Sequence, residues 1–314
     1  MTGAERVRFA VGGALMLALV TFGDARPAPT ATTPPRVRVR MVFDANFGDA
    51  VAREYERLLP DIQVERTIAI GSVATVAAIQ HDHADLGFAF ADVAYLGYLR
   101  ASRQPSIAPI QVLGIAALQL VPMHVLVRAG LRAQRIQDLA NYRVGVGTAL
   151  SSQALLADLL FKAYGLGPEV VQPDRRADLL AGVDATIATG FYPFPTVTAA
   201  MSRGAHLIPI DGPVAAQLRR EYPFVRQVTI PADTYPGQPT DIATLGVERL
   251  LIASSRLDEG LVHDLTRVFI ETLPEMAASM HTSIRLTNVE LASATPIPLH
   301  AGAAQYYRER ELTR

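Results

Sequence analysis

The sequence predicts an α/β protein with two lobes, built on mostly parallel sheet with helices on its faces. From Arg36 onward, stretches with the alternation of a strand are followed by stretches of helical period. A Gly, Ser, Thr, Asn or Asp stands at the turn between them, and two long extended segments interrupt this rhythm. With 314 residues, half of them hydrophobic, the chain is long enough to bury a large core.

The N-terminus is typical of a secretory signal peptide, which we assign to residues 1–25. Arg6 and Arg8 precede an uncharged apolar run from Phe9 to Phe22. This run is shorter than the roughly twenty residues that a membrane-spanning helix needs. Residues 26–35, rich in Pro and Thr, form a predicted flexible linker. We therefore expect a periplasmic protein, with an uncleaved membrane tether as the alternative.

Composition narrows the class of partner. The chain has 29 Lys and Arg against 30 Asp and Glu, a net charge of −1. Such a balance gives no basic stripe for a phosphate backbone, so we expect no nucleic-acid partner. The chain has no cysteine, which excludes disulfides, thiolate nucleophiles and zinc-thiolate sites. We predict neither a cofactor nor a metal.

The first lobe opens with three strand-turn-helix units. "RVRVRMVF" alternates charged and apolar residues as a strand does, and the helix after it places Val51, Tyr55, Leu58 and Leu59 on one face before Pro60 ends it. "IQVERTIAI" is the second strand, followed by a helix that begins near Ser72. "ADLGFAF" is the third, and Asp92 stands at the start of its helix, where N-capping is sufficient to explain an aspartate.

A second lobe follows a long extended run, "APIQVLGIAALQLVPMHVLVRAG", which Gly114 and Pro122 prevent from being one helix. Its units begin with "YRVGVG", "VDATIATG" and "AHLIPID", and "DIATLGVERLLIAS" is another extended stretch. We assign residues 36–121 and 229–314 to lobe I and residues 122–228 to lobe II. The turns of the two lobes would then face each other across a ligand cleft, because ligands of open α/β sheets bind at the carboxyl ends of the strands.

The Gly145-x-Gly147 turn invites comparison with a dinucleotide site. That fingerprint needs a third glycine, but Leu150 stands there, and the acid nearest the required distance, Glu169, is predicted to lie in a loop. What remains is a helix start with Thr148, Ser151 and Ser152 beside it. Free amides and a positive dipole end suit an anion or a carboxylate, although a plain helix cap explains the same residues.

Six segments carry a resemblance to a known family: "GSV" at 71–73, "ADLGFAFADVAY" at 84–95, "YRVGVGT" at 142–148, "YPFPTV" at 192–197, "TIPADTYPGQ" at 229–238 and "IPLHAGAAQYYRE" at 297–309. They resemble the TAXI family, the extracytoplasmic receptors of tripartite ATP-independent periplasmic (TRAP) transporters. The resemblance implies a type II periplasmic-binding-protein fold. It also implies that the lobes close on a small solute, often a carboxylate such as an amino acid, and that the solute passes to membrane permease subunits.

The sequence departs from the family pattern at three turns. The second-lobe turn "GTALSSQ" is usually richer in glycine in the family. The turn after the first strand reads "DANFGDA", with Asp44 where family members carry a glycine-rich segment, and an acidic turn disfavours a carboxylate. After Gly71-Ser72-Val73 the family tends to have Glu and Asn, whereas this chain has Ala74 and Thr75. Family membership is therefore better supported than the identity of the solute.

Twelve residues are predicted to bind the solute, each with a plainer alternative. Ser72 and the amide of Val73 bind from lobe I, or Ser72 caps a helix; Asn46 and Phe47 shape the pocket, or simply make a turn. Phe191, Tyr192 and Pro193 form an apolar wall, or a loop stiffened by two prolines. Tyr235 and Gln238 lie at the hinge or the rim, or form a Pro-Gly turn. The second lobe contributes Thr148, Ser151 and Ser152.

Two other functions remain open alongside the receptor. A cleft enzyme is disfavoured because the sequence has no Gly-x-Ser-x-Gly motif, no cysteine and no metal-ligand cluster, so no catalytic residue is assigned. A periplasmic sensor that signals to a membrane kinase would share the pocket and the closure and would differ only in its partner. His81-Asp82-His83 and Arg128 are predicted to be surface charges, and Met276 and Met280 to be core residues.

Overall fold

The computed structural model describes residues 37–43, 46–69, 71–104, 106, 110–149, 151–172, 178–279 and 292–312. The predicted signal peptide, the linker, Asp44, Leu150 and Met280 lie outside the described residues. Residues 36–314 form one compact unit. Among the described residues, no helix is long and apolar enough to span a membrane.

Lobe I is built on a sheet with the strand order β2-β1-β3-β10-β4. The strands β1 (Val37–Phe43), β2 (Ile62–Ile68) and β3 (Leu86–Phe90) are parallel, and each leads into its own helix at the carboxyl end. These helices are α1 (Asn46–Leu58), α2 (Ser72–Gln80) and α3 (Ala91–Arg103). The three predicted strand-turn-helix units are therefore confirmed, and their turns gather at one edge of the sheet.

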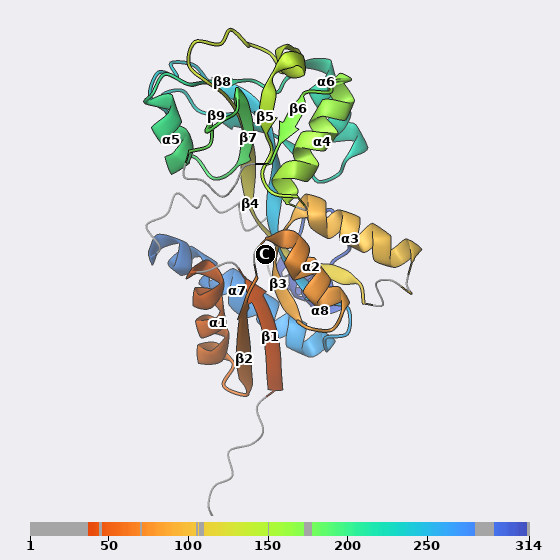
Figure 1. Ribbon diagram of the computed structural model, residues 1–314. Helices are drawn as coiled ribbons and strands as arrows, with labels where there is room; N and C mark the ends of the chain where they lie inside the picture. The colour runs from red at the N-terminus through yellow and green to blue at the C-terminus, as the bar shows by residue number, and fades with distance from the viewer. Residues whose placement is uncertain are drawn as a thin grey trace, which may run out of the picture. The chain divides into compact units, whose positions relative to one another are not determined.

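Two long strands connect the lobes, as the two extended segments of the sequence predict. β4 (Val112–Val127) pairs with β10 (Ile242–Ser254) as far as Pro122 and with β7 (Ala185–Thr189) from Met123 onward. The exchange of partners occurs at a proline, which has no N–H group to donate to a ladder. Both long strands run antiparallel to their neighbours, so the sheet is mixed rather than mostly parallel. Figure 1 shows β4 passing from one lobe into the other.

Lobe II completes its sheet with short strands. β5 (Arg143–Gly145) is parallel to β6 (Glu169–Val171) and to β7, and β8 (His206–Ile208) pairs with β4. The helices are α4 (Ser152–Tyr164), α5 (Pro195–Met201) and α6 (Gly212–Glu221), with a 3-10 helix at Ile136–Asn141. Glu169 was expected in a loop, but it begins β6 because Val170 and Val171 extend the parallel edge beside β5.

The chain returns through β9 (Val225–Ile230), which pairs with β10, and ends in α7 (Glu259–Ser279) and α8 (Ala301–Leu312). The lobe boundaries at residues 121/122 and 228/229 stay a prediction. The two central strands belong to both lobes, because β4 and β10 pair with each other and each carries a further partner at its lobe II end.

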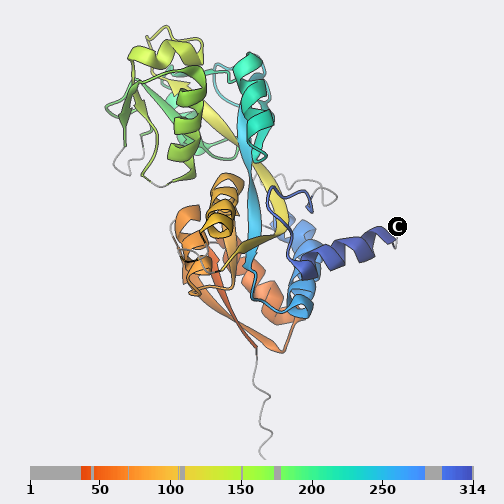
Figure 2. The same cartoon turned by 90° about the vertical axis from the view of Figure 1, so that its right-hand side faces the viewer.

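The core of lobe I has two layers, one on each face of the sheet. Val39, Met41 and Phe88 pack under α1, α7 and α8, whereas Val42 and Ala89 point to the opposite face, toward α2 and α3. This division follows from the two-residue period of a strand. Figure 2 shows the helices on either side of these strands. The apolar layer beneath α2 and α3 is continuous with the core of lobe II.

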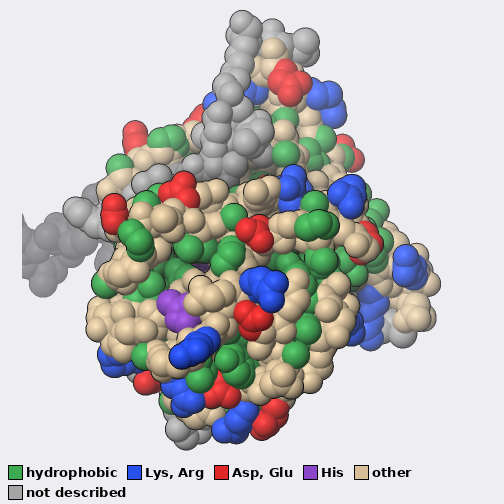
Figure 3. Space-filling view, turned by 90° about the horizontal axis from the view of Figure 1, so that it is seen from above, with side chains coloured by type: hydrophobic (Ala, Val, Ile, Leu, Met, Phe, Trp, Pro, Cys, Tyr) green, Lys and Arg blue, Asp and Glu red, His purple; other side chains and the backbone are tan. Residues whose placement is uncertain are grey.

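The burial of most of the side chains assigned to the core or the surface agrees with the predictions from the sequence. Val51 and Tyr55 are buried as predicted, but Leu58 is 38 % exposed because α1 ends at this residue. Met276 is buried. His81-Asp82-His83 and Arg128 are exposed as predicted, with Asp82 paired to Arg40 and Arg128 to Asp184. On the face seen in Figure 3, acidic and basic side chains are interspersed, as the small net charge leads one to expect.

Candidate functional site

Helix α2 presents its first amide groups at the carboxyl edge of the lobe I sheet. Its N-cap is Gly71, whose φ of 87° lies in the region that favours glycine, and no described side chain caps the helix. The N–H groups of Ser72, Val73 and Ala74 therefore have no partner within the helix. An unpaired helix start of this kind attracts a negatively charged group, because the amides and the helix dipole act together.

The alternative interpretation of Ser72, that its side chain caps α2, is wrong. Its Oγ accepts a hydrogen bond of 2.8 Å from the backbone N–H of Phe90, the last residue of β3. This bond joins the start of α2 to the end of the neighbouring strand and fixes their spacing. The hydroxyl still has its own proton to donate.

Arg249 of β10 brings a positive charge to the same place. It lies opposite Phe90 in the antiparallel ladder, and Leu251 lies opposite Phe88. The guanidinium carbon of Arg249 is 4.9 Å from the ring centroid of Phe88 and 5.8 Å from that of Phe47. Both distances are within the range of a cation–π interaction, which holds the guanidinium over the aromatic rings.

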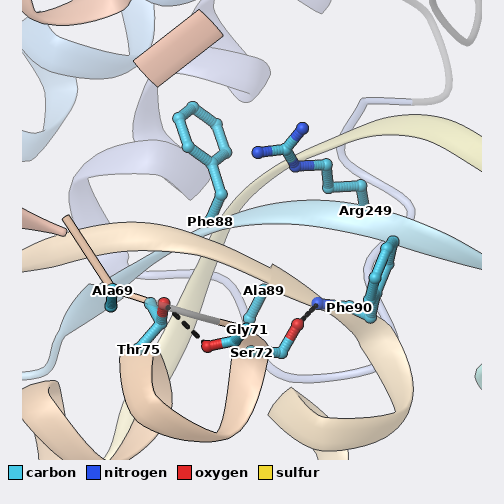
Figure 4. Close-up of a pocket in the computed structure, with 8 residues that line it drawn as sticks. All are labelled: Ala69, Gly71, Ser72, Thr75, Phe88, Ala89, Phe90 and Arg249. Atoms are coloured by element: carbon cyan, nitrogen blue, oxygen red, sulfur yellow. Dashed lines mark hydrogen bonds between the residues drawn. The ribbon is translucent and has the colours of Figure 1, made fainter. Parts of the chain in front are cut away.

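Arg249 and the start of α2 line one cavity, shown in Figure 4. Its volume of 40 Å³ is enough for a few water molecules or an anionic headgroup, so the rest of a solute would extend out of it. The lining residues are Ala69, Gly71, Ser72, Thr75, Phe88, Ala89, Phe90 and Arg249. The apolar walls lower the local dielectric constant and strengthen the attraction of both positive groups for an anion.

Three residues of lobe II that were predicted to bind the solute, Thr148, Ser151 and Ser152, differ from one another in their contacts. Ser151 is the N-cap of α4, because its side chain accepts a hydrogen bond of 3.1 Å from the N–H of Ala154. Ser151 therefore caps its helix, and its predicted solute-binding role stays a prediction. Ser152 is buried and donates its hydroxyl proton to Oδ2 of Asp92, in lobe I, at 2.6 Å. Thr148 is exposed.

A second, larger cavity of 430 Å³ lies between α2, α3 and the start of α4. The predicted residues Val73 and Ser151 line it, together with Val76, Ala77, Gln80, His81, Val93, Leu96, Gly97, Arg100 and Leu155. The two faces of α2 thus belong to different cavities. Ser72 and Thr75 face the cavity of Arg249, while Val73 and Val76 face the apolar one.

Phe47 forms a wall behind the Arg249 cavity instead of lining it. It is buried, and its ring lies 5.3 Å from that of Phe88 and 6.5 Å from that of Phe269. Asn46 is the first residue of α1, and its side chain lies outside the described part of the structure. The solute-binding roles of both residues stay predictions.

Tyr235 and Gln238 organise a buried turn that lines neither of the two cavities described above. The phenol oxygen of Tyr235 accepts a hydrogen bond of 2.9 Å from the N–H of Phe194 and lies 2.7 Å from Nε2 of His124. Burial lowers the pKa of His124 to about 4, so the imidazole is neutral at neutral pH. The side-chain amide of Gln238 donates to the carbonyls of Pro231 and Thr240, both at 2.9 Å.

The loop before α5 contains the predicted apolar wall. Phe191 and Tyr192 are half-buried and Pro193 is exposed, with a cis peptide bond between Tyr192 and Pro193. These three residues line neither of the two cavities. Within the described residues, no group of three His, Cys, Asp or Glu side chains is close enough to hold a metal ion.

Sequence reasoning missed Arg249 and Phe88. Glu248 and Arg249 are two adjacent charges in the middle of the mostly apolar run "DIATLGVERLLIAS". Charged residues are rare in a buried strand unless they have a partner or a function. That interruption was the available signal, but it does not say which other residues the arginine meets.

A family model described as the NMT1-like family matches residues 46–310. The chain belongs to the NMT1-like family. The TAXI resemblance is a finer assignment than this match supports.

Solved structures share the fold of this NMT1-like protein. XAC2383 from Xanthomonas citri bound to chloride ion superposes with a TM-score of 0.54 at 9 % identity, covering 88 % of this chain and 99 % of that one. PhnD1 from Prochlorococcus marinus in complex with methylphosphonate gives 0.50 at 14 % identity, covering 87 % and 98 %. The periplasmic aliphatic sulphonate binding protein SsuA from Escherichia coli gives 0.48 at 14 %, covering 90 % and 95 %. The predicted α/β fold class is confirmed, because the chain shares the fold of XAC2383 and PhnD1.

Proposed function

We propose that this NMT1-like protein is a periplasmic solute-binding receptor whose lobes close on a small anionic solute, such as an amino acid or another carboxylate. One observation carries the proposal. Arg249 and the residues at the start of α2, Gly71 and Ser72, line the same cavity, at the sheet edge where ligands of α/β proteins bind. A carboxylate, phosphonate or sulfonate accepts hydrogen bonds from both, and a planar guanidinium binds such a group with two parallel bonds.

The solved relatives support an anionic ligand. XAC2383 has structures bound to chloride and to ATP, and PhnD1 has one with methylphosphonate. These ligands are all anions, although they differ in size. In this chain, the small volume around Arg249 favours a single compact headgroup over a polyphosphate. The receptor binds its solute and releases it unchanged.

The membrane partner in this proposal is a TRAP-type permease. Its support is the TAXI resemblance, above all "TIPADTYPGQ" at 229–238 and "IPLHAGAAQYYRE" at 297–309. Ligand binding shifts the population toward the closed state, and the permease recognises that state. A permease driven by ATP hydrolysis or a sensor kinase would use the same closure. Reconstitution with each type of partner in vesicles distinguishes the three, because only a TRAP permease moves solute with an ion gradient and no ATP.

A binding panel tests the proposal. The purified chain is titrated with acetate, succinate, glutamate, methylphosphonate and ethanesulfonate by thermal shift and calorimetry, and the mixture is then analysed by mass spectrometry. We expect at least one anion to raise the melting temperature of the wild type, to lose affinity in R249A, and to be recovered unchanged. R128A, which removes an exposed arginine, is the matched control and keeps the affinity. Chemical conversion of a ligand, or equal affinity in R249A, contradicts the proposal.

A further inference from the structure

Two buried polar groups meet where the lobes touch. Asp92 is the second residue of α3 in lobe I, and Ser152 is the first residue of α4 in lobe II. Asp92 is fully buried, Ser152 is 5 % exposed, and the hydroxyl of Ser152 donates to Oδ2 of Asp92 at 2.6 Å. Sixty residues of chain separate them. Figure 1 shows the two helices that carry them.

This contact is more than helix capping. The N-cap of α3 is Phe90, and no described side chain makes a capping bond there. The neighbouring cap of α4 is Ser151, so the hydroxyl of Ser152 is left for a different partner. Asp92 is the second residue of α3 and not its N-cap; its carboxyl meets the backbone N–H groups of Asp92 and Val93 at the helix start and, in addition, the hydroxyl of Ser152.

The environment of Asp92 makes the bond to Ser152 important. Within the described residues, its Oδ1 has no hydrogen-bond partner although it is buried. Burial raises the pKa of Asp92 to about 6, and the Ser152 hydroxyl, followed by the backbone N–H groups of Val93 and Asp92, opposes this rise. A buried carboxyl with a single side-chain donor is destabilised sharply if that donor is lost. In an open arrangement, water would solvate both groups.

An aromatic contact also holds α3, the helix of Asp92, against lobe II. Tyr95, one turn after Asp92 on α3, packs its ring 5.5 Å from that of Phe224, which precedes β9. Neither Asp92 nor Ser152 lines the cavity of Arg249. Their position fixes the start of α4 relative to α3, and the bond of Ser72 to Phe90 fixes α3 relative to the start of α2.

We infer that Asp92 and Ser152 form an interlobe pair that holds α4 against α3 and raises the closed fraction of the protein before a solute arrives. The pair is a positioning pair, and its value for transport rests on the proposed function. It strengthens solute binding, because a receptor that is already closed for part of the time spends less binding energy on closure.

Distance measurement between the lobes tests this inference without a ligand. The chain has no cysteine, so Q63C and A163C introduce two label sites on exposed residues, one in each lobe, with no other site to remove. We expect the wild-type background to show a short interlobe distance, and S152A to shift the distribution to longer distances. D92N keeps an acceptor for the Ser152 hydroxyl and should retain the short distance.

The matched control is S151A. It removes the adjacent hydroxyl, which caps its own helix, so it lowers the melting temperature without opening the lobes. D92A removes the acceptor from the other side and is expected to lengthen the distance as S152A does, so the test does not depend on one variant folding. Equal ligand-free distributions in S152A, D92A and wild type overturn the inference, as does an equal shift in S151A.

Solute binding separates this inference from the proposed function. For an anion that binds the wild type, S152A is expected to bind about tenfold more weakly, mainly through faster dissociation. If no anion binds any variant but the S152A distances lengthen, the proposed function fails and the interlobe pair stands. If anions bind and neither distance nor affinity changes in S152A, the pair fails and the receptor stands.

Discussion

Replacing Asp92 by asparagine is expected to change how the stability of the protein depends on pH. The folded-state pKa of Asp92 is about 6, above the ordinary value of 3.8, chiefly because the carboxyl is buried. A raised pKa means that the folded state holds this proton more tightly than the unfolded state does. The stabilisation is complete below pH 3.8 and is lost as the pH rises through 6.

The size of the effect follows from the two pKa values. A tenfold change in proton affinity corresponds to about 1.4 kcal/mol, so the rise from 3.8 to about 6 corresponds to about 3 kcal/mol of unfolding free energy. Asparagine does not titrate, and its carbonyl oxygen can still accept the hydrogen bond from Ser152. D92N should therefore gain about 3 kcal/mol relative to wild type between acidic and neutral pH.

Urea unfolding of both proteins at several pH values between about 4 and 7.5 measures this difference. The free-energy difference between D92N and wild type isolates Asp92, because every other titrating group contributes equally to both. Circular dichroism and fluorescence of the tyrosines should report coincident transitions. A difference that stays constant over this range would refute the reasoning and would mean that Asp92 is solvated in the folded protein.

Three further predictions concern single side chains. R249K keeps the positive charge but loses the planar guanidinium that forms two parallel hydrogen bonds. Its affinity for a carboxylate or phosphonate, measured by calorimetry, should fall about tenfold, which is less than the fall in R249A. An affinity equal to that of the wild type would exclude a bidentate contact between Arg249 and the anion. His124 should make the stability of the protein depend on pH in the opposite direction to Asp92. Burial lowers the pKa of His124 from 6.5 to about 4, so about 3 kcal/mol of unfolding free energy is lost as the pH falls from 6.5 to 4. H124Q should not show this loss when unfolding is measured at acidic pH. The same loss in H124Q and wild type would contradict this prediction. S72A leaves the N–H of Phe90 without its acceptor and should lower the unfolding free energy by about 1 kcal/mol, whereas S102A, on an exposed part of α3, should leave it unchanged; equal effects would show that the Ser72 bond contributes nothing.

The local pattern of the sequence was sufficient for most of the elements. The strand alternation before Phe43 and the helical spacing of Val51 and Tyr55 depend only on near neighbours in the chain, and the structure confirms both. The long apolar run containing Pro122 was identified as a crossover for the same reason, because a proline and a glycine within it exclude a helix.

The partners of the individual site residues did not follow from those patterns. Ser151 and Ser152 are adjacent and chemically identical, yet one caps its own helix and the other bonds to a carboxyl sixty residues away. Nothing in the local sequence separates them. Their difference arises from which face of the α4 start is turned toward lobe I.

The sequence by itself determined an α/β chain with helix starts at the sheet edge, because helix and strand periods are set by neighbouring residues. Only the tertiary structure placed Arg249 at the cavity. Its position depends on antiparallel pairing with β3, opposite Phe90, across more than half the chain. The two-residue period of β10 then puts it on the same face as Leu251, over Phe88. Strand order and register are set by packing of the whole core, so no short stretch of sequence specifies them.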